Sequence, residues 1–255
     1  MVIRHLVIPY GKTCNLRCKY CAEFVPYYSS EQRLKKNLRQ TIEDINKIAG
    51  AVDSITKLNI SGGEVLLCDD IYSLTEAIIE IHNVKQLCIV TNGSHIPKSG
   101  LLAHLAHFNN RVLIQISGYR SLKLPIKEFI DKLIKHELLF RVRNEQVWFD
   151  LLNTDYRKTS LAELKHKFHY CKCSVDSWLY VDGYLGHSCC RPNRMFFLDK
   201  WDECRDEVIR VSDCLSENIV PEMQRIMSLE YSQICNYCDG VYNDANPIPP
   251  AMCQL

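Results

Sequence analysis

The sequence predicts an α/β protein in which parallel strands alternate with helices, followed by a smaller cysteine-rich α+β region. Over the first ~150 residues, short apolar runs alternate with amphipathic stretches, which is the pattern of βα units in a parallel sheet. Beyond residue 155 this alternation stops, and nine of the 14 cysteines lie after residue 170. We therefore expect a barrel-like domain over residues 1–155 and a second domain over residues 156–255.

Five apolar runs are expected to form the strands of the first domain. They are residues 5–9, 57–60, 86–91, 112–117 and 138–142, and a sixth strand is expected at 147–152. The segments between the strands have a helical period; Ile42, Ile45 and Ile48, for example, recur three residues apart. Expected helices are residues 34–49, 71–81, 99–106 and 126–136, with 159–168 in the second domain.

Size, charge and cysteine content restrict the classes of function. At 255 residues and 47% hydrophobic content, the chain is long enough to bury a sizeable core. The net charge of +1 gives no overall field that favours nucleic acid or a membrane surface. No apolar run has transmembrane length, and residues 1–10 lack a signal-peptide pattern, so we expect a cytoplasmic protein. In a reducing compartment, cysteines more often bind metal or react than form disulfides.

Three cysteines near the N-terminus carry the strongest functional signal. Cys14, Cys18 and Cys21 have the spacing C-x3-C-x2-C directly after the first expected strand. Three thiolates can hold three corners of a cuboidal iron–sulfur cluster, whose usual complement is four cysteines. The iron left without a protein ligand is then an open coordination position, as in catalytic metal sites. The alternative is a buried helical stripe, but three of the five residues between the cysteines are Asn, Arg or Lys.

Polar and glycine-rich residues follow the next three expected strands. These segments are Ser61-Gly62-Gly63-Glu64, Thr91-Asn92-Gly93 and Ser117-Gly118-Tyr119. In parallel α/β folds the ligand site lies at the carboxyl ends of the strands. We therefore expect these three loops and the cysteine loop to face one pocket.

The cysteine motif after the first strand, together with Gly62-Gly63-Glu64 after the second, closely resembles the radical S-adenosylmethionine (SAM) superfamily. The resemblance implies a partial (β/α)6 barrel, a [4Fe-4S] cluster on Cys14, Cys18 and Cys21, and SAM chelated to the open iron through its amino and carboxylate groups. It also implies that an electron from the cluster cleaves SAM to methionine and a 5′-deoxyadenosyl radical, which abstracts a hydrogen atom from the substrate. The reducing partner is then a flavodoxin or ferredoxin. Val65 departs from the family pattern, in which proline is common at this position.

The resemblance also assigns the SAM contacts on the first two loops. Gly62 and Gly63 allow close backbone approach, and Glu64 accepts a charge-assisted hydrogen bond from the α-ammonium of SAM. Tyr20 occupies the aromatic position that lies against the adenine in this family.

Later strands are expected to supply the remaining contacts. Ser117 is assigned to the ribose, the alternative being an ordinary turn serine. Arg143 or Arg141 is assigned to the SAM carboxylate, the alternative being an exposed strand charge, and Asn92 is expected near the deoxyadenosyl group.

The C-terminal cysteines resemble the twitch domain, a shortened SPASM domain that holds one auxiliary four-iron cluster. The residues that carry this resemblance are Cys171, Gly183, Cys189, Cys235 and Cys238, and their order and gaps look much like those of 2-deoxy-scyllo-inosamine dehydrogenases. Four thiolates would saturate such a cluster and leave it an electron relay.

Ligand identity and metal stay open in this second domain. Cys173 and Cys190 are equally near, so they, or a mixed pair, are alternative ligands. A structural zinc site with His169 or His187 is the rival interpretation. Asp182-Gly183 between strand-like runs is typical of a hairpin turn.

Several reactions are compatible with these motifs. We expect oxidation of a C–H centre in a small polar substrate, such as a sugar or cyclitol, with Arg191 and Arg194 available for an anionic group. Epimerisation is the first alternative, with a cysteine S–H as hydrogen donor, and modification of a ribosomally made peptide is the second. A non-catalytic metal-binding module is the third. Spare cysteines for the epimerase are Cys68, Cys204, Cys214 and Cys253. We expect no nucleic-acid partner and no membrane association.

Overall fold

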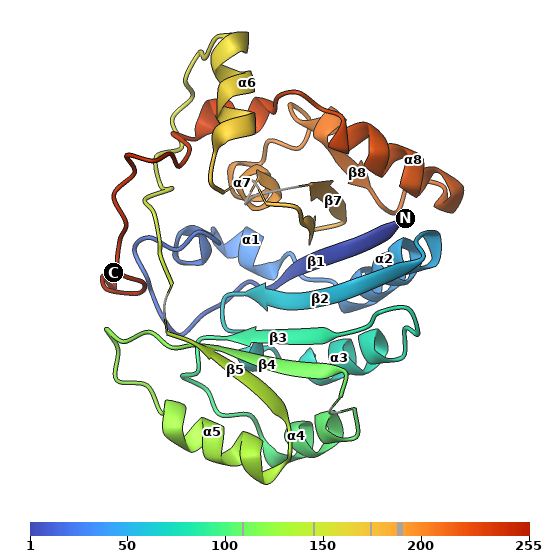
Figure 1. Ribbon diagram of the computed structural model, residues 1–255, viewed down its shortest axis with the longest axis vertical. Helices are drawn as coiled ribbons and strands as arrows, with labels where there is room; N and C mark the ends of the chain where they lie inside the picture. The colour runs from blue at the N-terminus through green and yellow to red at the C-terminus, as the bar shows by residue number, and fades with distance from the viewer. Residues whose placement is uncertain (109, 145, 174, 188–190) are drawn as a thin grey trace.

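The computed structural model describes the whole chain except residues 109, 145, 174 and 188–190 (Figure 1). The described strands form one sheet of eight in the order β5-β4-β3-β2-β1-β6-β7-β8. Five are parallel neighbours: β1 (Val2–Gly11), β2 (Ser54–Gly62), β3 (Leu87–Thr91), β4 (Val112–Ser117) and β5 (Leu139–Arg143). On the other side of β1, β6 (Trp178–Val181) is parallel to it, and β7 (Tyr184–His187) and β8 (Val208–Arg210) continue antiparallel.

Helices alternate with the first five strands and cover one face of the sheet (Figure 1). They are α1 (Ser30–Leu34), α2 (Leu38–Ala51), α3 (Ile71–Ile79), α4 (Ser99–Ala106) and α5 (Ile126–Lys135). The C-terminal part adds α6 (Leu161–Tyr170), α7 (Arg191–Leu198) and α8 (Ser216–Met227). Short 3-10 helices are η1 (Val25–Tyr27), η2 (Val65–Leu67), η3 (Arg205–Glu207) and η4 (Gln233–Tyr237). Among these helices, none combines the length and apolar character that crossing a membrane requires.

The two faces of the parallel sheet differ in polarity, because successive strand residues point to opposite faces. Leu58 and Ile60 of β2 are completely buried in the core beneath the helices. The opposite face carries polar side chains on β4 and β5, where Gln115 pairs with Arg141 and Ser117 pairs with Arg143. The apolar face packs against the helices, and the polar face is available to line a ligand site.

The predicted α/β class is confirmed, and so are the first five strands, with small differences at their ends. The predicted sixth strand at 147–152 is wrong. This apolar run makes only an isolated bridge, between Trp148 and Ile248, and β5 stays the edge of the sheet. The predicted helix at 34–49 corresponds to α2 but begins later, at Leu38, because Asn37 caps α2 by accepting a hydrogen bond from the Gln40 N–H at 3.0 Å; Leu34 instead ends the short helix α1.

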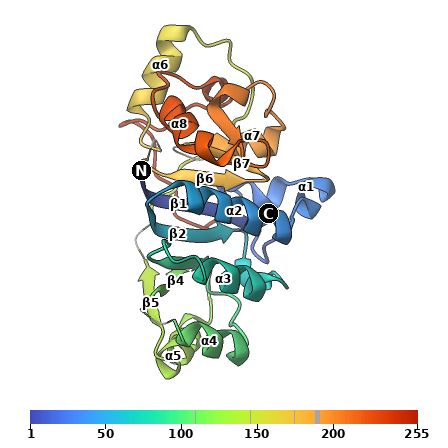
Figure 2. The ribbon, with the colours of Figure 1, turned by 90° about the vertical axis from the view of Figure 1, so that its right-hand side faces the viewer.

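The C-terminal part continues the same sheet. Asp182 and Gly183 have φ values of 51° and 87°, as a tight hairpin between β6 and β7 requires. β6 lies beside β1 (Figure 2), and Trp178, Tyr180 and Leu185 are buried in the same hydrophobic core as β1. The domain boundary near residue 155 stays a prediction; it falls in the connection between β5 and α6.

Candidate active site

The cysteine loop begins where β1 ends, at Gly11. Two short turns fold it, in which the N–H of Cys21 donates to the Cys18 carbonyl at 3.2 Å and the N–H of Phe24 to the Cys21 carbonyl at 3.0 Å. Burial raises the pKa of all three thiols, that of Cys21 to about 12. Burial therefore favours the neutral thiols, and a bound cationic iron centre would favour the thiolates.

The Gly62-Gly63-Glu64 loop packs directly on the backbone that leads into the cysteines. The Gly63 N–H donates to the Gly11 carbonyl at 2.7 Å, and the Glu64 N–H donates to the Thr13 carbonyl at 2.9 Å. A Cβ on Gly63 would lie 2.0 Å from the Thr13 oxygen, and Gly62 has φ +118°. Both glycines are therefore required for this contact between the two loops. The motif had assigned their close approach to SAM and not to the cysteine loop.

Glu64 joins the ends of β2 and β3. Its side chain is completely buried and accepts hydrogen bonds from the Thr91 hydroxyl at 2.8 Å, the Asn92 N–H at 2.7 Å and the Leu66 N–H at 3.1 Å. Burial raises its pKa, and these three hydrogen bonds oppose the shift. Glu64 thus fixes the loop geometry in the protein itself, while its contact with SAM stays a prediction.

Asn92 brings the loop after β3 to the cysteine loop. Its Nδ2 lies 3.5 Å from the Cys14 sulfur and donates to the Asn15 Oδ1 at 3.1 Å. Ser94 donates to the same Asn15 oxygen at 3.0 Å. The expected meeting of the first three loops at one edge of the sheet is confirmed by these contacts.

Tyr119 follows the Ser-Gly that ends β4, in one of the loops expected at the pocket. Its ring packs edge-on against Trp148, with 5.6 Å between the ring centres. Burial raises its pKa, and a hydrogen bond with Ser117 opposes the shift.

The two arginines of β5 differ in their partners. The guanidinium of Arg141 donates a hydrogen bond to Gln115. Arg143 lies two residues further along β5, beside Ser117, and its guanidinium makes no hydrogen bond or ion pair with the described residues. Arg143 is therefore the better placed of the two to bind an anion.

Tyr20, which is expected to lie against the adenine, is partly buried, and the Lys19 ammonium lies 5.2 Å from its ring centre.

The residues present fit the cofactors that the motifs imply. The Asn59 Oδ1 and Ser61 Oγ of β2 are buried without a hydrogen-bond partner among the described residues, close in sequence to Gly62-Gly63. Such acceptors suit a ligand with ammonium and hydroxyl donors, as SAM has. Within the described part of the chain, no three His, Cys, Asp or Glu side chains converge on a single metal ion; a cuboidal cluster instead takes one thiolate at each of several irons.

A second group of cysteines lies in the C-terminal part. Cys171, Cys235 and Cys238 line one small cavity together with the cations Lys167 and Arg191. Backbone N–H groups donate to two of the sulfurs, from residue 241 to Cys171 at 3.3 Å and from residue 240 to Cys238 at 3.4 Å. Hydrogen bonds to sulfur are among the features that tune iron–sulfur clusters.

The alternative ligands are placed differently. Cys173 is partly buried and is not among the residues that line this cavity. Cys189 and Cys190 lie outside the described residues. Of the two histidines considered for a zinc site, His187 has its Nε2 3.5 Å from the Asp176 Oδ1, and His169 packs edge-on against Phe168.

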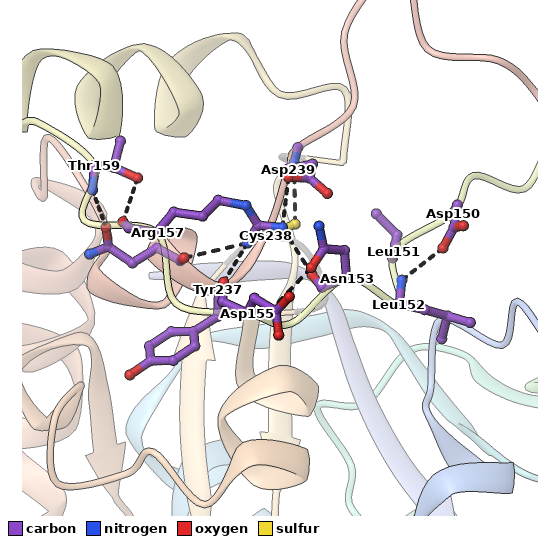
Figure 3. A network of polar contacts seen from close by, with 12 residues as sticks. Asp150, Leu151, Leu152, Asn153, Asp155, Arg157, Thr159, Tyr237, Cys238 and Asp239 are labelled. Carbon is purple, nitrogen blue, oxygen red and sulfur yellow. Dashed lines mark hydrogen bonds and ion pairs between the residues drawn. The ribbon is translucent and has the colours of Figure 1, made fainter.

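Polar contacts hold η4, which carries Cys235, in place. Buried Glu207 accepts hydrogen bonds from the Ser232 hydroxyl and the Gln233 N–H at the start of η4. On the other side, Arg157 pairs with Asp239 at 2.6 Å, directly after Cys238 (Figure 3).

Arg194 has a structural role, contrary to the expectation that it contacts substrate. Its side chain is 2% exposed and donates to the Tyr237 carbonyl at 2.7 Å and the Leu151 carbonyl at 2.7 Å. The buried guanidinium ties segment 151–153 to η4, because it is the partner of otherwise unpaired backbone oxygens. It is therefore not available to a substrate anion.

Comparison with family models and curated proteins finds relatives of the N-terminal half of the chain. The family model described as "Radical SAM superfamily" matches residues 8–137, which is just over half of the chain. Curated relatives named GTP 3′,8-cyclase include one from Staphylococcus epidermidis, 33% identical over 100 residues, and one from Alkaliphilus oremlandii, 34% identical over 100 residues. Each match covers 38% of this chain and 29% of the relative, so the matched segment spans less than a third of those proteins.

Solved structures with the same fold match over nearly the full length. Native anSMEcpe with bound AdoMet has a TM-score of 0.59 at 12% identity, covering 99% of this chain and 94% of that one. BtrN in complex with AdoMet and 2-DOIA has a TM-score of 0.51 at 12% identity, covering 100% of this chain and 99% of that one. At this level of identity the likeness is one of fold.

Proposed function

The chain belongs to the radical SAM superfamily, and from this premise we propose that it reductively cleaves SAM and oxidises a C–H centre of a small polar substrate. The observation that carries the proposal is the convergence of Cys14, Glu64 and Asn92 at the carboxyl ends of β1, β2 and β3. When bound, the cluster and SAM would supply the electron and the 5′-deoxyadenosyl radical that removes a hydrogen atom. Cytoplasmic location and a flavodoxin or ferredoxin reductant stay predictions.

The residues of this chain would bind and orient the reactants. Cys14, Cys18 and Cys21 would hold the cluster, and Arg143 would meet the SAM carboxylate because its guanidinium has no partner among the described residues. The polar face of β4 and β5, where Gln115 accepts a hydrogen bond from Arg141, would line the space for a hydroxylated substrate, and Ser117 would contact the ribose of SAM. A polar lining of this kind suits sugars or cyclitols better than apolar substrates.

Substrate class is best tested by the increase in SAM turnover when a candidate substrate is added. We expect 2-DOIA, the compound in the BtrN complex, or a related aminocyclitol to stimulate 5′-deoxyadenosine formation and to lose two hydrogens. GTP is the necessary comparison, because the curated relatives are named GTP 3′,8-cyclases. If only GTP stimulates turnover, the chain is a nucleotide cyclase and the oxidation proposal is wrong.

Epimerisation is the second candidate, and the position of Cys253 supports it. The carbonyl of Cys253 accepts a hydrogen bond from the Lys19 N–H at 2.8 Å, beside the cysteine loop. The other spare cysteines lie elsewhere: Cys68 and Cys204 are buried, and Cys214 packs at the edge of the core beneath the helices. A thiol at Cys253 would break its S–H bond and transfer the hydrogen atom to the substrate radical, leaving a thiyl radical.

Product mass in D2O separates the two reactions. We expect oxidation to give a product lighter by two hydrogens, with no deuterium retained at the reacting carbon, and unchanged product in Cys253→Ala. A product with one carbon-bound deuterium, whose formation stops in Cys253→Ala but not in Cys214→Ala, would instead establish epimerisation.

We also propose an auxiliary [4Fe-4S] cluster on Cys171, Cys235, Cys238 and either Cys189 or Cys190. Two-hydrogen oxidation needs an acceptor for the second electron, which such a cluster would supply. The shared cavity and the N–H groups directed at the Cys171 and Cys238 sulfurs support this assignment.

Iron content tests the auxiliary cluster. Anaerobically reconstituted protein is expected to hold about eight irons per chain, and Cys235→Ala about four, with SAM cleavage retained. Stoichiometric zinc in the protein as purified, with about four irons that Cys235→Ala leaves unchanged, would show that the second site is not an iron–sulfur cluster.

A further inference from the structure

We propose that residues 248–255 form a strap across the active-site loops, and that Gln254 sets the reduction potential of the SAM-binding cluster by donating a hydrogen bond to the Cys18 sulfur. The inference rests on the assignment of Cys14, Cys18 and Cys21 to that cluster; it does not depend on the substrate. In Figure 1 the C-terminus lies on the side toward which the β2 and β3 arrows point.

The strap contacts three loops in succession. Ile248 and Trp148, which follows β5, exchange backbone hydrogen bonds of 2.8 and 3.2 Å. The Ser121 hydroxyl, which follows β4, donates to the Pro250 carbonyl at 2.9 Å. A turn follows, in which Ala251 is buried with φ 55° and the Met252 N–H donates to the Pro249 carbonyl at 3.4 Å. The strap thereby links the loops after β4 and β5 before it reaches the cysteines.

At the cysteine loop, the strap pairs like an antiparallel strand. Gln254 forms a bridge with Cys18. On either side of this bridge, the Leu255 N–H donates to the Arg17 carbonyl at 2.8 Å, and the Lys19 N–H donates to the Cys253 carbonyl at 2.8 Å. These bonds fix the backbone on both sides of the middle cysteine of the motif.

The side chain of Gln254 is fully engaged at this point. Its Oε1 accepts the Arg17 N–H at 2.7 Å, and its Nε2 donates to the Ala251 carbonyl at 3.0 Å and to the Cys18 sulfur at 3.2 Å. The orientation of the amide is determined by its neighbours, because the Arg17 N–H requires an acceptor and the Ala251 carbonyl requires a donor. The N–H that faces Cys18 is thus fixed by partners other than the sulfur.

A hydrogen bond to a ligating thiolate changes the redox behaviour of a cluster. The donor stabilises negative charge on the sulfur, and the reduced cluster carries more negative charge than the oxidised one, so the bond raises the reduction potential. Three prolines between residues 247 and 250 restrict the unbound strap and reduce the entropy lost when it is ordered. Gln254 is therefore a positioning residue that acts on the cluster through Cys18.

The midpoint potential of the reconstituted cluster tests this role. Gln254→Met keeps the length of the side chain and removes its donor, and Leu255→Ala is the matched control, because the Leu255 side chain is 52% exposed and its backbone hydrogen bond is retained. All variants carry Cys235→Ala, so that the electron paramagnetic resonance signal of the reduced protein comes from the N-terminal cluster.

We expect Gln254→Met to shift the potential to a more negative value, so that the ratio of reduced to oxidised cluster at fixed potential falls threefold to tenfold; tenfold is 59 mV for a one-electron couple. Faster loss of the cluster in air, with Leu255→Ala unchanged, would also support the strap. An unchanged potential and air stability at full iron content would overturn the inference. Failure of the unsubstituted protein to bind a cluster would overturn the cysteine assignment itself.

Discussion

Cys14→Ala is expected to abolish reductive cleavage of SAM and to remove about four irons per chain. The variant leaves only two thiolates of this loop to hold the cluster, one fewer than the three on which its binding depends. The Cys14 sulfur accepts from the Leu16 N–H at 3.4 Å and from Asn92 at 3.5 Å. The measurements are iron content and 5′-deoxyadenosine after anaerobic reconstitution with dithionite.

Cys214→Ala provides the control for this experiment. The Cys214 thiol donates to the neighbouring Leu215 carbonyl at 3.4 Å, and we expect full iron content and normal SAM cleavage. If Cys14→Ala retained its iron and its activity, the N-terminal cysteines would be the buried stripe that their spacing also allows.

Gly63→Ala is expected to separate the loop after β2 from the cysteine loop. The added Cβ would lie 2.0 Å from the Thr13 oxygen and 2.6 Å from its carbonyl carbon, both backbone atoms that cannot move aside alone. Overpacking of side chains costs about 1–3 kcal/mol, and a clash with backbone exceeds that range unless the loop shifts. We expect loss of the Gly63–Gly11 hydrogen bond, a lower unfolding temperature and at least a tenfold loss of SAM cleavage.

Gly50→Ala is the matched substitution away from the site. Gly50 lies in α2, and an added Cβ meets no atom within 4 Å. Replacing a helical glycine by alanine stabilises a protein by about 0.5–1 kcal/mol, so the unfolding temperature should rise slightly and SAM cleavage should be unchanged. Equal behaviour of the two variants would contradict the proposed contact between the loops.

The parts of the fold that depend on local pattern were predicted from the sequence. The βα alternation located β1 to β5, and Asp182-Gly183 located the β6–β7 turn, because strand runs and turns are specified by neighbouring residues. The pairing of β6 with β1 was missed, since two buried apolar strands carry no local signal for which one joins which. Residues 147–152 have the composition of a strand, but of these only Trp148 forms a bridge in the described structure, with Ile248 of the strap.

In the candidate site, too, the residues that belong to short motifs were predicted, and the contacts between distant segments were not. The cysteine motif and the glycine motif identified the loops of the site, because each motif lies within a few neighbouring residues. Contacts between distant segments were not predictable. Gln254 donates a hydrogen bond to the Cys18 sulfur, 236 positions away in the sequence. Arg194 donates to the carbonyls of Leu151, which precedes it, and Tyr237, which follows it. Tyr119 was expected at the pocket as part of the loop after β4, but no motif assigned it a contact.

The account is tested most directly by quantifying 5′-deoxyadenosine from the anaerobically reconstituted full chain, supplied with SAM and dithionite. We predict formation of 5′-deoxyadenosine and methionine in equal amounts, dependent on the reductant and absent in Cys14→Ala. A protein that holds about four irons on Cys14, Cys18 and Cys21, binds SAM and yet yields no 5′-deoxyadenosine would contradict the proposed function.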